Sequence, residues 1–172
     1  APFEFSSNYQ PAHGISQYLC GTQPIVSLSL LQCGLDVFEA ANALGGMPAL
    51  RAKSLALTDL FISLIEQRCS GHGIRFVTPR EHARRGSQVS LTIDGQASGS
   101  PAYAIVQALI ARGVVGDFRA GDSRHHPDIL RFGFTPLYLG FEDVWTAVEH
   151  LHGVLESGEW KSARFQEKSA VA

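Results

Sequence analysis

One arginine stands in a predicted strand whose other residues are nearly all apolar. In the stretch 129–138, alternate residues fall on one face (Leu130, Phe132 and Phe134), and Arg131 falls on the other face with Gly133. A guanidinium in such a setting needs an anion, because a buried unpaired charge is strongly unfavourable. Gly133 leaves the space beside Arg131 open. Two alternatives follow: a structural salt bridge to a nearby Asp or Glu, or a site that binds an anionic ligand.

Other residue types that carry chemistry form no recognisable motif. The sequence contains no nucleophile elbow, no phosphate-binding P-loop and no G-x-G-x-x-G. The three lysines are Lys53 on a predicted helix and Lys161 and Lys168 in the tail. None of them has the setting of a buried amine with a lowered pKa. The chain therefore offers no evident catalytic residue of its own.

Cysteine and histidine spacing argues against disulfides and metals. The three cysteines, Cys20, Cys33 and Cys69, are an odd number without metal-type spacing. We therefore expect free thiols and a cytoplasmic protein. The pair His125-His126 has no second ligand motif at metal spacing, so we expect no metal site.

Composition sets the broad class of the protein. The 172 residues are 45% hydrophobic and 17% charged, with a net charge of −2. This is a globular composition without a basic patch for nucleic acid. No apolar run is long enough for a membrane span, and the N-terminus does not look like a signal peptide. The sequence does not begin with Met, which suggests a piece of a longer chain.

The first part of the chain predicts an arm and an unusual helix. Residues 1–21 have no period and are punctuated by Pro and Gly. Thr22 is predicted as the N-cap of a helix from residue 25 to about 41, with Pro24 in the first turn. This helix has no charge between Pro24 and Leu35 and is apolar on most of its circumference. A helix of this kind is buried, and the remaining chain is too small to surround it.

The rest of the chain alternates between helical and strand patterns. Helices are predicted over about 47–69, 101–112 and 141–157, and strands over 74–78, 89–93, 114–118 and from 129 onward. Ser100 is predicted to cap the second of these helices, with Pro101 at its first position. The order α-β-β-α-β-β-α favours a small α/β sandwich, a sheet covered by helices. The residues after Trp160 are predicted to be a polar, frayed tail.

Five blocks of sequence resemble the C-terminal part of bacterial kynureninases, in the same order and over nearly the whole chain. The blocks are residues 19–25 (LCGTQPI), 49–58 (ALRAKSLALT), 78–90 (TPREHARRGSQVS), 112–117 (RGVVGD) and 130–138 (LRFGFTPLY). Two stretches, 94–100 and 120–128 with the paired His, are longer than the usual pattern and are interpreted as surface insertions.

The resemblance implies a fold and an activity. The family is similar to fold-type-I pyridoxal 5'-phosphate enzymes, which act as homodimers, and it hydrolyses kynurenine to anthranilate and alanine in tryptophan catabolism. Residues 1–45 would then be the end of the large cofactor domain, 46–160 the C-terminal α/β domain, and 161–172 the tail. The family's cofactor-holding lysine lies in the large domain and would be outside this chain.

The resemblance also implies roles for single residues. Arg131 matches the arginine that binds the α-carboxylate of the substrate, and Thr22, with Gly21, matches a residue near the cofactor phosphate. A simple N-cap remains the alternative for Thr22. Arg84 and Arg85 are interpreted as solvated loop charges, and Tyr138 as a packing residue. This part of the enzyme would orient the substrate without performing the chemistry.

Two alternatives to this function stay open. Another fold-type-I enzyme, such as a desulfurase-like or aminotransferase-like relative, would share a C-terminal carboxylate arginine. A non-enzymatic α/β partner module would account for the missing lysine.

Overall fold

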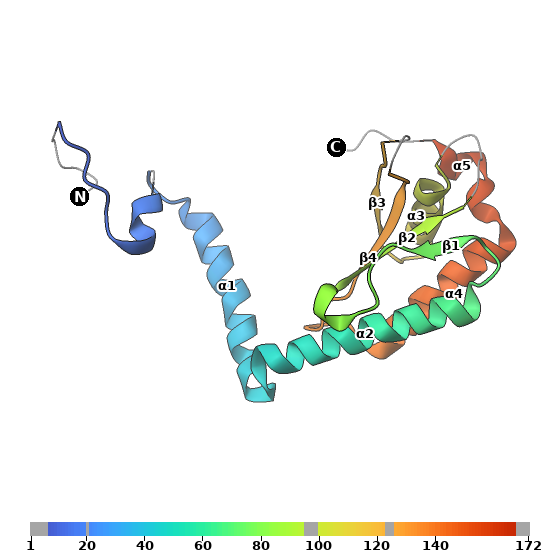
Figure 1. Cartoon of the computed structure of the whole chain (residues 1–172), viewed down its shortest axis with the longest axis horizontal. Coiled ribbons are helices and arrows are strands. Elements are labelled where there is room, and N and C mark those ends of the chain that lie inside the picture. The colour runs from blue at the N-terminus through green and yellow to red at the C-terminus, as the bar shows by residue number, and fades with distance from the viewer. Residues whose placement is uncertain (1–6, 20, 95–99, 123–125, 168–172) are drawn as a thin grey trace. The chain divides into compact units, whose positions relative to one another are not determined.

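The chain divides into two compact units, residues 1–47 and 48–172. A computed structural model describes residues 7–19, 21–94, 100–122 and 126–167 (Figure 1). No helix in these ranges combines the length and apolar character that a membrane span requires.

Unit 1 contains a short 3-10 helix (Gly14–Tyr18), helix α1 (Ile25–Ala41) and a 3-10 turn (Asn42–Leu44). The prediction that Thr22 caps α1 is wrong. The N-cap is Pro24, whose backbone is extended and whose carbonyl accepts the first helical bond from the N–H of Leu28 at 3.0 Å. Thr22 therefore lies two residues before the N-cap and does not cap the helix.

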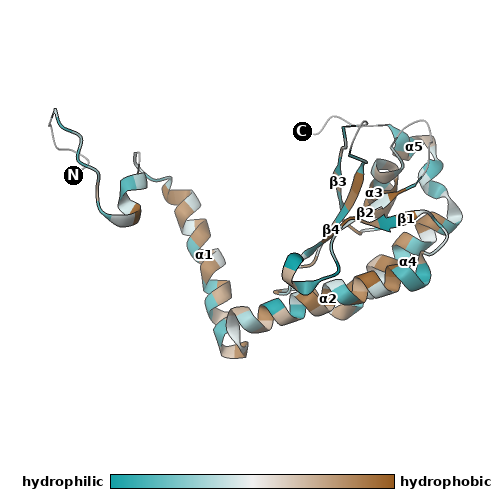
Figure 2. Cartoon of the chain, viewed as in Figure 1, coloured by the Kyte–Doolittle hydropathy of each residue, from teal (hydrophilic) through white to brown (hydrophobic). Residues whose placement is uncertain are grey.

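Helix α1 is largely apolar (Figure 2), and none of its residues is buried. Its exposed large side chains are Ile25, Val26, Leu28, Leu30, Leu31, Leu35, Val37 and Phe38. The sequence predicts burial of this helix, but within unit 1 no described segment buries any of its residues. Apolar area of this extent normally marks a contact surface.

Unit 2 has the predicted order of elements and one additional helix. Its elements are α2 (Gly46–Arg68), β1 (Ile74–Phe76), β2 (Gln88–Ile93), α3 (Pro101–Ala111), β3 (Asp117–Arg119), β4 (Ile129–Gly133), α4 (Phe141–Ser157) and α5 (Ala163–Gln166). The Ser100 cap is confirmed, because its Oγ accepts from the N–H of Tyr103 at 3.2 Å and Pro101 opens the helix. The small α/β fold class is confirmed as well.

The four strands form one antiparallel sheet in the order β1-β2-β4-β3. One face carries the alternating apolar residues of β2 and β4, which are buried against the helices of unit 2. On this face the ring of Phe61, from α2, lies 5.0 Å from that of Phe132 and 4.9 Å from that of Phe134. The buried core includes Leu57, Phe61, Val89, Leu91, Ile105, Leu109, Leu130, Phe132, Val148 and Leu151.

The second face of the sheet carries a polar row across three strands. Ser90 on β2 lies opposite Arg131 on β4, and Arg131 lies opposite Asp117 on β3. Residues directly opposite in antiparallel strands project to the same side of the sheet. Register therefore brings these three polar side chains together on the face that lacks the apolar core.

Residues 161–167 are not frayed as the composition predicts, whereas residues 168–172 lie outside the described residues. After α4, a 3-10 turn (Glu159–Lys161) leads into the short helix α5. Phe165 from α5 is only 6% exposed and belongs to the core cluster of unit 2. Burial of this large aromatic ring removes a large apolar area from water and so stabilises the folded segment.

Candidate functional site

Arg131 forms an ion pair with Asp117 across the β3–β4 ladder. Its Nε donates to Oδ2 of Asp117 at 2.8 Å, and its Nη2 donates to the same oxygen. The salt bridge to a nearby acidic residue, one of the two alternatives for Arg131, is therefore present. The side chain of Arg131 is 29% exposed, so solvent or a ligand still reaches it.

A second arginine shares the same carboxylate. Arg119, two residues after Asp117 on β3, donates from Nε to Oδ2 of Asp117 at 2.9 Å. Two guanidinium groups and one carboxylate leave this cluster with one net positive charge. A positively charged cluster at the surface attracts a further carboxylate or phosphate.

Asp117 occupies only one side of the Arg131 guanidinium. The Nε and Nη2 atoms form one edge of the planar group, and Asp117 lies there. Nη1 has no hydrogen-bond partner among the described residues. The end formed by Nη1 and Nη2 is therefore available for the parallel two-bond contact that arginine makes with carboxylates. The two alternatives for Arg131 are thus compatible with each other.

The row also borders a polar hollow. Ser90, next to Arg131 in the row, lines a hollow of about 400 Å³ together with Thr78, Gln88 and Arg84. Hydroxyl, amide and guanidinium groups dominate this lining.

Gly21 and Thr22 lie in unit 1 and are exposed. An added Cβ at Gly21 would meet nothing within 4 Å, so the backbone there is open to an approaching group. The hydroxyl of Thr22 and the backbone N–H of Gly21 are hydrogen-bond donors, which is the chemistry that phosphate oxygens accept. Gly21 and Thr22 belong to unit 1, whereas Arg131 belongs to unit 2.

The described lysines are engaged in structural contacts. Lys53 donates from Nζ to the carbonyl of Pro136 at 2.8 Å, and Nζ of Lys161 lies 5.4 Å from the centre of the Trp160 ring. Lys168 lies outside the described residues. The described part of the chain therefore presents donors for a phosphate but no free amine in a pocket.

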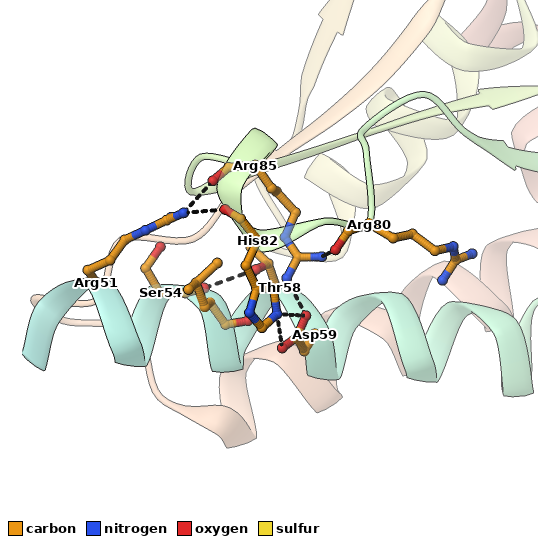
Figure 3. Close-up of polar contacts among 8 residues, drawn as sticks. Arg51, Ser54, Thr58, Asp59, Arg80, His82 and Arg85 are labelled. Carbon is orange, nitrogen blue, oxygen red and sulfur yellow. Dashed lines mark hydrogen bonds and ion pairs between the residues drawn. The ribbon is translucent and has the colours of Figure 1, made fainter.

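The interpretation of Arg85 as a solvated charge is wrong. Its side chain is 1% exposed and forms an ion pair with Asp59 of α2, and its Nη1 donates to the carbonyl of Arg80 at 3.2 Å (Figure 3). Arg84 is solvated as predicted, with a 69% exposed side chain beside Glu81. The basic sequence of this loop gives no local signal of which arginine turns inward.

The loop that contains Arg85 is tied to α2 at several points (Figure 3). Asp59 also accepts from Nε2 of His82 at 2.9 Å, and Arg51 donates to the carbonyls of His82 and Arg85, each at 2.7 Å. Burial alone would raise the pKa of Asp59, but the hydrogen bonds from Arg85 and His82 outweigh it and lower this pKa. The contacts fix the loop before β2 and hence the start of that strand.

The predictions for Tyr138 and for the two insertions have different outcomes. Tyr138 is not a packing residue in this chain, because it is 78% exposed in the turn before α4. His125 lies outside the described residues, as do residues 95–99 of the other insertion. Among the residues that are described, no group of three His, Cys, Asp or Glu side chains is arranged to hold a metal ion.

The fold and this site define a class of protein: a small α/β domain with an arginine held on the second face of an antiparallel sheet. Comparison with protein families identifies the class more closely. The family model described as Kynureninase C-terminal domain matches residues 50–151. The chain belongs to the kynureninase family.

Curated relatives agree with this assignment. A kynureninase of Pseudomonas fluorescens is 51% identical over 169 residues, which cover 98% of this chain and 37% of the relative. Kynureninases of Burkholderia mallei (strain SAVP1) and Burkholderia pseudomallei (strain K96243) are each 49% identical over 171 residues, covering 99% of this chain and 37% of the relative. The chain thus spans 37% of the length of these relatives and corresponds to a C-terminal segment.

Proposed function

We propose that this chain is the C-terminal part of a pyridoxal-phosphate-dependent hydrolase that cleaves L-kynurenine to anthranilate and L-alanine. Its role would be to bind and orient the substrate. The observation that carries the proposal is the partly exposed Arg131, paired with Asp117 along one edge and open along the other. Membership of the kynureninase family supports the proposed reaction, and the open end of Arg131 supports a contact with an amino-acid carboxylate.

In this proposal, Arg131 binds the α-carboxylate of kynurenine through Nη1 and Nη2. Two parallel charge-assisted bonds fix both the position and the rotation of a carboxylate. They would therefore decide which bond at Cα faces the cofactor. When bound, the cofactor supplies an electron sink for the chemistry at that carbon.

Thr22 and Gly21 would contact the cofactor phosphate, in a homodimer through the cofactor of the facing subunit. The exposed hydroxyl of Thr22 and the open backbone at Gly21 support this role. The lysine that anchors the cofactor would come from a large domain, to which residues 1–45 would belong. The complete enzyme would be cytoplasmic and would act in tryptophan catabolism.

The decisive experiment replaces Arg131 with Ala in the complete enzyme. Loss of a charge pair with the substrate should cost about 2–5 kcal/mol, seen as a steep rise in KM. Arg75→Ala is the matched control, since Arg75 stands on the same sheet in an exposed pair with Asp94. An unchanged KM in the Arg131 variant would leave that residue with its salt bridge alone.

Two simpler measurements separate the alternatives. Product analysis with kynurenine and with cysteine distinguishes a kynureninase from a desulfurase-like relative. Borohydride reduction of the isolated chain with pyridoxal phosphate should attach no cofactor to Lys53, Lys161 or Lys168. A trapped adduct on any of them would contradict the assignment of the anchoring lysine to another domain.

A further inference from the structure

We propose that Asp117 is a positioning residue that holds Arg131 ready for the substrate carboxylate. This inference rests on the proposed function, because it concerns the same contact. The structural basis is that Asp117 and Arg131 are direct neighbours across the β3–β4 ladder. Both ends of the ion pair are therefore anchored on strands of one sheet, which is a rigid support for a site.

The geometry of the ion pair leaves the Nη1–Nη2 end of the Arg131 guanidinium free to bind a ligand. Asp117 contacts Nε at 2.8 Å and also Nη2, both through its Oδ2. These contacts fix the plane of the guanidinium along the edge nearest the main chain. The Nη1–Nη2 end, which points away from that edge, is left to meet a second carboxylate. An arginine held in this way needs less ordering when the substrate binds, since a long free side chain loses rotamer entropy at that moment.

Arg119 compensates the negative charge that Asp117 places beside Arg131. A carboxylate beside the binding arginine would by itself cancel the positive charge and repel the substrate. Nε of Arg119 lies 2.9 Å from the same Oδ2 atom and compensates that negative charge. The cluster keeps one net positive charge, so the site remains attractive to an anion while Arg131 stays oriented.

The test uses Asp117→Asn in the complete enzyme, with L-kynurenine as the substrate. The amide keeps the shape but loses the charge that holds the guanidinium. KM should rise about 10- to 30-fold, as expected for one lost charge-assisted contact and one side chain freed from a fixed orientation. The kcat should change by less than about threefold, because in the bound complex Arg131 still contacts the carboxylate and orients Cα, and only the cost of ordering its side chain has increased. Asp94→Asn, in the exposed pair with Arg75 of the same sheet, should leave KM unchanged.

A ligand without the carboxylate separates positioning from general damage. The decarboxylated amine of kynurenine should bind equally well to the wild type and to Asp117→Asn, because Arg131 has nothing to contact in it. Equal losses for both ligands would show a structural defect and overturn the inference. If Asp117→Asn does not fold, Asp117→Glu keeps the charge, displaces the carboxylate by one methylene and should show the same difference between ligands.

The double variant distinguishes the failure of this inference from the failure of the proposed function. In the Arg131→Ala background, Asp117→Asn should have no further effect on KM. If Arg131→Ala raises KM and Asp117→Asn does not, positioning is wrong and the proposed function stands. If Arg131→Ala itself leaves KM unchanged, the proposed function fails and this inference fails with it.

Discussion

Arg85 and Asp59 form an ion pair of unequal burial: the arginine side chain is 1% exposed and that of the aspartate 46%. The pair joins the loop before β2 to helix α2. Nε of Arg85 is buried without a partner among the described atoms, so Asp59 carries most of the compensation for this charge. The stability of the loop therefore depends on Asp59 more than its exposed position suggests.

Replacing Asp59 with Ala should lower the free energy of unfolding by about 2–3 kcal/mol, because a buried guanidinium would lose its charged partner. Chemical denaturation of this chain measures the loss. Asp94→Ala removes the carboxylate of an exposed pair and should cost less than about 0.5 kcal/mol. Equal effects of the two substitutions would contradict the special role of Asp59.

The same pair should make stability depend on pH in acid. The folded-state pKa of Asp59 is lowered, so between the folded and unfolded values the unfolded chain binds more protons. The contribution of Asp59 is therefore complete above about pH 4 and is lost as the pH falls further. Denaturation of the wild type and of Asp59→Asn from pH 6 to pH 3 should show converging stabilities, and a constant difference would contradict the assignment.

Cys69 should be chemically inert in the folded chain. Burial raises the pKa of its thiol to about 11. At pH 8 only about 0.1% of the group is then the reactive thiolate. Peptide mapping after iodoacetamide treatment should find Cys69 modified only once the chain is unfolded, with the exposed Cys33 as the internal reference. Rapid labelling of Cys69 under native conditions would show that its site is open.

Helix α5 should contribute measurably to the stability of unit 2. Phe165→Ala removes a ring that is 6% exposed, and we expect a loss of about 3 kcal/mol, at the lower end for such truncations. The control is Tyr138→Ala, which removes an aromatic ring that is 78% exposed and should have little effect. A Phe165 variant as stable as the control would restore the interpretation of this segment as a frayed tail.

Much of the local structure could be predicted from the sequence. The bounds of α1 and the start of α4 coincide with the structure, and the cap at Ser100 is found as expected. These features depend on hydrophobic period and on cap residues, which act over a few positions along the chain. The same short-range rules misplace the N-cap of α1, because Pro24 and Thr22 both suit a helix entrance.

Only part of the candidate site could be predicted from the sequence. The sequence marks Arg131 by itself, since a charge in an apolar strand demands a partner. The partner is Asp117, 14 residues away along the chain and on a different strand. Nothing in the alternation of one strand says which other strand will pair with it. The matching block 112–117 includes Asp117, but nothing in that block indicates that Asp117 pairs with Arg131.

The sequence by itself therefore determined the elements, the family and the arginine that needs an anion. Only the tertiary structure decided that β3 lies beside β4, that Asp117 takes one edge of Arg131, and that Arg85 rather than Arg84 turns inward. The physical reason is the range of the interactions. Period and capping are local, whereas the fate of a charge depends on strand order, register and burial, which arise only when distant segments pack together.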